Sequence, residues 1–326
     1  MSRRFLFVVS ALVVLAAVPA ARASGPMPLA VQGGPGVVGP GGKLRYTAVP
    51  AGADTVLTAV SVADGTLRRT LDQPGQLGIP QVVYGGSAAD GVSADGRTLV
   101  LESTGMPGSE TSFRIVDLRR MYVREYFTLQ GAWAYDALSP DGRILYLIRY
   151  TSTSDLTRYV VRAYDTVRRT LLPGRIADRT QKTWIMQGFP VARTISPGGR
   201  WVYTLYDNPG GYPFVHALDT VAGVAHCVGL PWHGSDADVY KLVVALRDGG
   251  RSLAVHTRGG PAWLTIRRGS WRISYAAPGT GFPWSWAGPG IGAGLVALAA
   301  AALLLLRRRR RREEVEERPR QELGLA

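Results

Sequence analysis

The densest group of polar side chains that could do chemistry lies in the heptapeptide WHGSDAD, residues 232–238. His233, Asp236 and Asp238 offer an imidazole and two carboxylates, a donor set that can begin a divalent metal site. Their spacing matches neither an EF-hand loop nor a zinc signature. A surface loop is the alternative interpretation, and the spacing favours it over the metal site.

A second candidate is the cationic segment GRIADRTQKTWIMQG, residues 174–188. Arg175, Arg179 and Lys182 place three positive charges close to the indole of Trp184. Cations interleaved with an aromatic ring can recognise a polyanion or a glycan. A solvated surface loop is again the alternative. These four side chains are our predicted binding residues.

Signatures of familiar catalytic sites are missing from the sequence, which contains no G-x-S-x-G, H-E-x-x-H, Walker or C-x-x-C motif. Its four histidines are dispersed; His216 and His226 flank a predicted hairpin, and His256 ends a predicted strand. A single histidine in a strand is more often structural than catalytic. We therefore expect neither catalysis nor a cofactor.

The elements that would position these side chains are marked by a recurring line. It reads GPGGK at 39–43, SADGR at 93–97, SPDGR at 139–143, SPGGR at 196–200 and DGGR at 248–251. The anchors Gly41, Asp95, Asp141, Gly198 and Asp248 are 54, 46, 57 and 50 residues apart. Self-similarity at a period near fifty predicts stacked or radial modules.

Each module has the same order of segments: an apolar stretch, the turn, an alternating strand such as ILYLIRY, a loop, and two more strands around a short turn, as in YVVRAYD-TVR-RTLLP. Four short strands per module in a radial array form a β-propeller. Both faces of ILYLIRY are largely apolar, which suits a blade between two others. We predict an all-β fold, a β-propeller of about five four-stranded blades, or six if a weak copy is hidden.

Turn chemistry accounts for the recurring letters without any function. Pro140 presets φ near −65°, Asp141 can accept hydrogen bonds from nearby backbone N–H groups, and Gly142 tolerates a positive φ. Gly198 and Gly41 stand where the other copies have aspartate. A catalytic aspartate would not recur as glycine, so Asp141 is interpreted as a turn residue.

The SPDGR lines resemble the repeats of TolB-like and YVTN-type β-propellers over about residues 40–277. This resemblance implies the fold and leaves function open, because these families include binding modules, envelope proteins and enzymes. Lactonase-like members use acidic metal ligands from several blades. Loops between the second and third strands of a blade usually share a face with the blade-to-blade connections. Here these are the loops 103–112, 151–157, 207–213 and 257–261 and the connection 174–188.

The two ends of the chain predict export and membrane anchoring. Arg3 and Arg4, an apolar run and the A-x-A site at Ala23 form a secretory signal peptide. The arginine pair partly resembles a twin-arginine signal, but the strongly apolar run favours the general secretory route. Residues 287–306 carry no charge and are long enough to span a membrane. Six arginines beginning with Arg307 and Arg308 follow, which places the C-terminus in the cytoplasm.

Other features of the C-terminal region set smaller expectations. Trp284 and Trp286 lie where membrane-interface aromatics are expected. Gly288 and Gly292 form a G-x-x-x-G spacing that could support a weak dimer. The sequence APGTG around Thr280 resembles a sortase signal, L-P-x-T-G, but has alanine for leucine; cell-wall attachment is therefore a minor alternative.

Charge and cysteine content limit the partners. The net charge is +14, and removing the +3 of the signal and the +3 of the tail leaves +8 on the exported part. The basic residues are almost all arginine, as GC-rich coding would give. No dense stripe of Lys and Arg with several interleaved aromatics appears outside the tail, so nucleic acid is not an expected partner. Cys227 is the one cysteine, so the exported part has no internal disulfide.

The predicted organisation follows from these observations. It comprises a signal peptide (1–23), a lead-in with the first inner strand (24–39), the propeller ectodomain (40–278), a linker (279–286), a transmembrane helix (287–306) and a basic and acidic tail (307–326). The predicted function is an anchored module that binds a protein or polymer outside the membrane. A propeller hydrolase with a metal in its central channel is the alternative.

Overall fold

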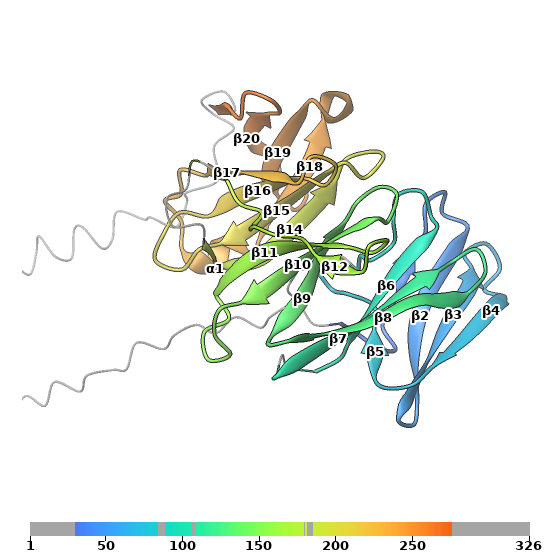
Figure 1. Ribbon diagram of the computed structural model, residues 1–326. Helices are drawn as coiled ribbons and strands as arrows, with labels where there is room; N and C mark the ends of the chain where they lie inside the picture. Colours follow the sequence, from blue (N-terminus) through green and yellow to red (C-terminus); the bar gives the residue numbers. More distant parts are fainter. Residues whose placement is uncertain (1–29, 84–88, 106–107, 179, 181–184, 276–326) are drawn as a thin grey trace, which may run out of the picture. The chain divides into compact units, whose positions relative to one another are not determined.

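A computed structural model describes residues 30–275, except 84–88, 106–107, 179 and 181–184. In these ranges 21 strands form five antiparallel sheets, which follow one another along the chain (Figure 1). The chain is therefore all-β with four-stranded sheets as its repeating unit, as predicted, and this organisation is consistent with a β-propeller. The sheets are called blades 1 to 5.

Blades 1 to 3 each combine short and long strands. Blade 1 contains β1 (Val37–Val38), β2 (Leu44–Ala51), β3 (Asp54–Ser61) and β4 (Leu67–Gln73). Blade 2 contains β5 (Leu77–Gly78), β6 (Thr98–Ser103), β7 (Glu110–Asp117) and β8 (Tyr122–Gln130). Blade 3 contains β9 (Trp133–Leu138), β10 (Ile144–Tyr150), β11 (Arg158–Asp165), β12 (Thr170–Leu171) and β13 (Met186–Gln187).

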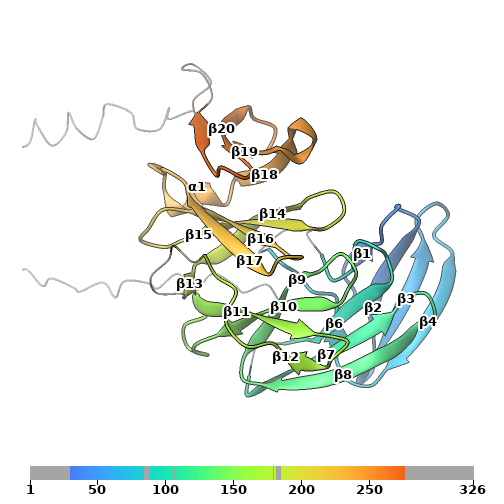
Figure 2. The same ribbon diagram turned by 45° about the horizontal axis from the view of Figure 1, so that its top comes forward.

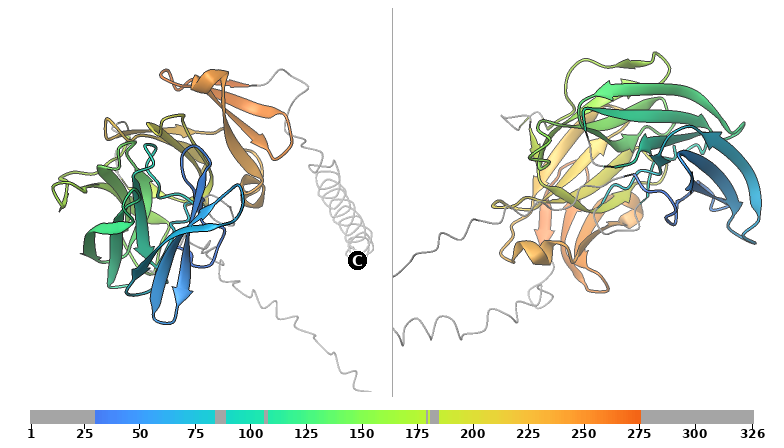
Figure 3. Two further views of the ribbon diagram at one scale, coloured as in Figure 1. Left: turned by 90° about the vertical axis from the view of Figure 1, so that its right-hand side faces the viewer. Right: turned by 90° about the horizontal axis from the view of Figure 1, so that it is seen from below.

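The last two blades are the most regular. Blade 4 contains β14 (Phe189–Ile195), β15 (Trp201–Asp207), β16 (Phe214–Asp219) and β17 (Val224–Gly229). The short helix α1 (Asp236–Val239) lies in the connection to blade 5 (Figure 2). Blade 5, orange in Figure 3, contains β18 (Leu242–Arg247), the 3₁₀ turn Asp248–Gly250, β19 (Ser252–Thr257), β20 (Ala262–Arg267) and β21 (Ile273–Tyr275).

Each blade is a meander in which consecutive strands pair, so hairpins of short reach build the sheet. Two departures occur. In blade 3 both β12 and β13 pair with β11, at opposite ends of that strand. In blade 2 the first strand is interrupted: β5 pairs with one end of β6, and an isolated bridge from Val92 to Leu99 holds the other end.

Apolar cores lie between consecutive blades. β10 shows why, because its two faces contribute to different cores. Leu145 and Leu147 pack with blade 2, whereas Tyr146 and Ile148 pack with blade 4. A third cluster joins blades 1 and 2. The prediction that ILYLIRY is packed on both faces is confirmed.

The recurring line forms a hydrogen-bonded turn after the first strand of each blade. In blade 3 the Gly142 N–H donates to the Ser139 carbonyl at 2.9 Å. The Asp141 carboxylate accepts hydrogen bonds from the Ser139 hydroxyl at 2.6 Å and the Arg143 N–H at 3.1 Å. Both hydrogen bonds of the Asp141 carboxylate stabilise the turn, so the structural interpretation of this aspartate is confirmed.

The copies with glycine adopt a different turn. Gly198 has φ of +80° and Gly41 has φ of +82°, the value for the third position of a type II turn. Asp141 and Asp95 have no positive φ, and only the glycine after each of them does. The exchange of aspartate for glycine therefore changes the turn type while the closing hydrogen bond is kept.

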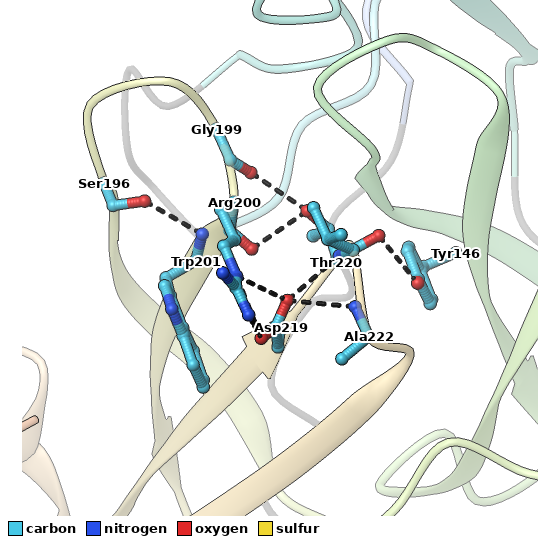
Figure 4. A network of polar contacts seen from close by, with 9 residues as sticks. Tyr146, Ser196, Gly199, Arg200, Trp201, Asp219, Thr220 and Ala222 are labelled. Carbon is cyan, nitrogen blue, oxygen red and sulfur yellow. Dashed lines mark hydrogen bonds and ion pairs between the residues drawn. The ribbon is translucent and has the colours of Figure 1, made fainter. Parts of the chain in front are cut away.

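A second polar motif, which sequence reasoning did not single out, lies at the same end of the blade as the recurring turn and is bonded to it. The Asp219 carboxylate binds Arg200 in a bidentate pair and accepts the N–H groups of Val221 and Ala222 (Figure 4). The Thr220 hydroxyl donates to the Gly199 carbonyl. Asp165 and Asp117 cap the corresponding turns of blades 3 and 2 in the same way, so these carboxylates are structural.

Several predictions made from the ends of the chain concern residues outside the described part. These are the signal peptide, Trp284, Trp286, Thr280, Gly288, Gly292, the apolar segment 287–306 and the tail with Arg307 and Arg308. Among the described residues no helix combines the length and apolar character needed to cross a bilayer.

Candidate functional site

A hollow of about 340 Å³ lies where the connection from blade 3 meets the outer strands of blade 4. From the connection come Ala177, Asp178 and the segment from Ile185 to Gln187. Blade 4 contributes Asn208 and Tyr212 from the loop between β15 and β16, Phe214 at the start of β16, and Cys227 and Gly229 of β17. The volume is at the lower end of ligand pockets, enough for one side chain or one sugar ring.

Local pairing explains why these segments meet. Phe214 and Gly229 are cross-strand partners at the open end of the β16–β17 hairpin. Met186 and Gln187 are held by β11, which fixes the end of the connection beside blade 4. The described residues of the connection 174–188 and the loop 207–213 therefore line one hollow together.

The lining is amphipathic. Phe214 stacks on Tyr206 with ring centroids 5.1 Å apart and, with Ile185 and Met186, supplies an apolar wall. Asp178, Gln187 and Asn208 supply hydrogen-bonding groups. The arrangement suits a ligand group with an apolar face and a polar edge.

Asp178 is held in place as an anion. Its carboxylate accepts the Thr180 N–H and hydroxyl at 2.8 and 2.7 Å and the Cys227 N–H at 2.7 Å. Burial alone would raise the pKa of this carboxyl group, but the hydrogen bonds from Thr180 and Cys227 outweigh it and keep the pKa below its usual value. The hollow therefore carries a fixed negative charge that favours hydrogen-bond donors and cations.

Cys227 is a second residue of the hollow whose side chain could take part in chemistry. Its Sγ is 3.5 Å from Nδ1 of His216, an arrangement that invites comparison with a catalytic Cys–His pair. Burial raises the pKa of the Cys227 thiol to about 12 and lowers the pKa of His216 to about 4. Both groups are therefore neutral near pH 7, and the thiol is not activated for nucleophilic attack.

Of the predicted binding residues, only Arg175 is described; it lies exposed in the connection, and Arg179, Lys182 and Trp184 lie outside the described residues. The binding prediction for these four side chains stays a prediction. The residues that line the hollow, such as Asp178 and Cys227, were not selected from sequence because nothing in their spacing indicates that they face each other.

The predicted metal ligands are placed around α1. Ser235 caps this helix and Asp238 returns the contact, a reciprocal capping box. Asp238 also pairs with Lys241 at 2.7 Å. Within the described ranges, no three or more His, Cys, Asp or Glu side chains are grouped so that they could hold a metal ion. Asp238 thus has a structural contact in α1, and the metal assignment of His233, Asp236 and Asp238 stays a prediction.

A buried ion cluster joins three blades. Arg193 of β14 lies with Nε 3.7 Å from the Asp90 carboxylate, ahead of β6, and with Nη1 3.5 Å from that of Asp136 in β9. The Arg193 side chain is 3% exposed. Burial raises the pKa of both carboxyl groups, against the opposing effect of the Arg193 charge. Sequence reasoning missed this cluster.

Comparisons with known proteins give no family assignment. No protein-family model and no curated protein matches the chain. Solved structures that resemble it include hydrazine synthase from Kuenenia stuttgartiensis (14% identity, TM-score 0.44), TolB from Acinetobacter baumannii (14%, 0.39) and the Cps50 (Swd1) β-propeller domain from Myceliophteria thermophila (10%, 0.43). They cover 77%, 69% and 74% of this chain. The chain in turn covers 65%, 48% and 68% of those chains.

Proposed function

We propose that the protein is a membrane-anchored, extracytoplasmic binding module without catalytic activity. Its ligand is a protein or polymer, of which one side chain or one sugar ring enters the hollow between blades 3 and 4. The observation that carries this proposal is the hollow itself, with its apolar wall at Phe214 and its fixed carboxylate at Asp178.

The lining also indicates how the ligand is held. An apolar face of the ligand would pack on Phe214 and Met186, and a hydrogen-bond donor would reach Asp178. Tyr212 is 60% exposed at the rim and can contact the rest of the ligand. This division between a buried anchor and an exposed rim is typical of recognition sites.

A metal-dependent hydrolase, the alternative, is not favoured by the groups that the blades bring together. Asp90 and Asp136 are buried carboxylates from different blades, but the guanidinium of Arg193 lies between them. That charge would repel a divalent cation at this place. The neutral Cys227 thiol likewise offers no nucleophile.

The location belongs to the proposal and is supported by sequence alone. The signal peptide at 1–23 would place blades 1 to 5 outside the cytoplasm, and the uncharged segment 287–306 would anchor them. We also propose that the SPDGR lines are repeats of the YVTN type, because such repeats are compatible with a binding protein at the cell surface.

The test is a substitution that places a large side chain in the hollow. A Cβ at Gly229 would meet no atom within 4 Å, and the glycine has no positive φ, so Gly229→Phe is compatible with the backbone. The full chain is produced in cells with a photo-cross-linking amino acid at Tyr212. We expect a cross-linked partner that disappears with Gly229→Phe and persists with Gly108→Phe, a matched control in blade 2 where a Cβ also meets nothing.

Two outcomes would contradict separate parts of the proposal. Equal cross-linking in the Gly229→Phe and Gly108→Phe variants would exclude the hollow as the binding site. Recovery of the unmodified chain in the soluble fraction after cell breakage would exclude the anchor while leaving the hollow untouched.

A further inference from the structure

Blade 5 has two unlike faces. Val244, Val255 and Leu264 are aligned across three strands, and β18 packs on β14 and β15 of blade 4. On the opposite face, the part nearest the β18–β19 and β20–β21 turns is made of small and polar residues in two cross-strand rows. One row contains Ala245, Ala254, Thr265 and Ser274, and the other contains Arg247, Ser252 and Arg267 beside Arg272.

Arginines surround this polar face. Two adjoining hollows of about 570 and 610 Å³ share Asp248, Ser252 and Arg267 in their lining. Arg251 and Arg268 line the first, and Arg247 and Arg272 line the second. All five arginines are exposed. We call this surface the blade 5 arginine face.

The charge of this face is not neutralised by the protein. Residues 242–275 contain six arginines and one acid, Asp248, a net charge of +5. None of the six makes an ion pair with a described residue, whereas arginines of the other blades do, such as Arg68 with Asp64, Arg143 with Asp165 and Arg200 with Asp219. The Asp248 carboxylate accepts the Ser252 hydroxyl.

We propose that the blade 5 arginine face binds a linear polyanion that carries phosphate groups. Guanidinium groups bind phosphate through paired N–H donors, and five of them along a concave face can engage successive phosphates. The hydroxyl of Ser274 lies among these cations and can donate to the same oxygens, whereas those of Ser252 and Thr265 donate to Asp248 and to the Ser274 carbonyl. The small side chain at Ala262, which is partly exposed, leaves room for the polymer.

A concave surface can accommodate a single polymer strand better than the flat surface of a bilayer. We therefore propose a polymer, and not anionic lipid, as the ligand. This site is distinct from the hollow between blades 3 and 4. It adds a second ligand to the proposed binding module and does not depend on the first.

The experiment uses the full chain in detergent and labelled inorganic polyphosphate as the probe. Residues 307–312 are changed to glutamine in every sample, because their six arginines would bind the same probe. We expect Arg267→Gln to weaken binding about fivefold, the factor for one charge pair at about 4 Å in water, and Arg267→Gln with Arg272→Gln to weaken it about 25-fold. Binding should also weaken steeply with added salt.

Two matched variants sharpen the test. Arg258 is an exposed arginine of the same blade that lines neither hollow, so Arg258→Gln should leave the affinity unchanged. Asp248→Asn removes the one negative charge, keeps an oxygen for Ser252 and suits the left-handed φ of +55°. This variant should bind polyphosphate several-fold more tightly.

The proposal is overturned if Arg258→Gln and Arg267→Gln weaken binding equally, because the charge would then act without a site. It is also overturned if vesicles containing anionic phosphatidylglycerol bind through Arg267 and Arg272 while polyphosphate does not. That second result would assign the face to the membrane. Unchanged near-ultraviolet circular dichroism of each variant shows that the fold is retained.

Discussion

Glu102 is a buried residue of blade 2, and none of the described cations pairs with its carboxyl group. It is 5% exposed in β6, and its Oε2 accepts the Tyr135 N–H at 2.9 Å from the neighbouring blade. Burial raises the pKa of Glu102 from 4.5 to about 8. The side chain is therefore protonated near neutral pH and links two blades as a neutral group.

This shift makes stability depend on pH in a defined direction. The folded state holds the Glu102 proton more tightly than the unfolded state, so the contribution is complete below about pH 4.5 and is lost as the pH rises through 8. We expect the free energy of unfolding to fall by on the order of 3–5 kcal/mol between pH 5 and pH 8 from this residue. Glu102→Gln should remove this part of the decrease and be the more stable protein at pH 8.

Urea unfolding of the two proteins at several pH values measures the difference, which isolates Glu102 from other groups. Asp207 is one such group, since burial raises its pKa to about 6 and it contributes in the same direction. A difference that stays constant from pH 5 to pH 8 would show that Glu102 is charged in the folded protein.

At the scale of elements, the turns show what sequence could and could not predict. The copies of the SPDGR line predicted the position of the turn in each blade, because proline, aspartate and glycine have local backbone preferences. The change of turn type at Gly198 was not predicted, since it follows from a positive φ at one position. The contact of Gly142 with blade 2 was not predicted either, because it depends on how two blades pack.

The two glycines Gly142 and Gly198 separate local strain from packing between blades. Both have a positive φ, but a Cβ at Gly142 would lie 2.3 Å from Thr98 Oγ1 of blade 2, whereas one at Gly198 would meet nothing within 4 Å. Gly198→Ala should cost about 1–2 kcal/mol, the penalty of the left-handed conformation. Gly142→Ala should cost about 1–3 kcal/mol more, because it also overpacks the contact with Thr98.

The midpoints of urea unfolding give both values. Equal losses for Gly142→Ala and Gly198→Ala would mean that blade 2 yields to the added methyl group, and the close contact between the turn and Thr98 would then have no energetic weight.

At the scale of the whole molecule, contacts between blades depend on residues far apart in sequence. The spacing of the recurring line predicted about five blades, because its turn signals are local in sequence. The candidate site was predicted only as the meeting of a loop and a connection; Asp178 and Cys227 were missed because they are 49 positions apart. Arg193 and Asp136, 57 positions apart, were missed for the same reason.

Arg193 is the residue through which three blades share one buried charge network, so its loss should be felt beyond blade 4. Arg193→Met leaves Asp90 and Asp136 buried beside an apolar side chain, and removing one partner of a buried ion cluster costs about 3–5 kcal/mol. The cost should be smaller at pH 5 than at pH 8, because burial raises the pKa of both carboxyl groups and their protonated forms need no cation.

Combining Arg193→Met with Asp90→Asn and Asp136→Asn separates charge from packing. If the network acts through charge, this triple variant should regain much of the lost stability at pH 8 and lose its pH dependence. Hydrogen exchange of β6, β9 and β14 should accelerate together in Arg193→Met, since the three blades lose a common partner. Faster exchange confined to β14 would show that the arginine stabilises its own blade alone, and that the apolar cores between blades suffice to couple them.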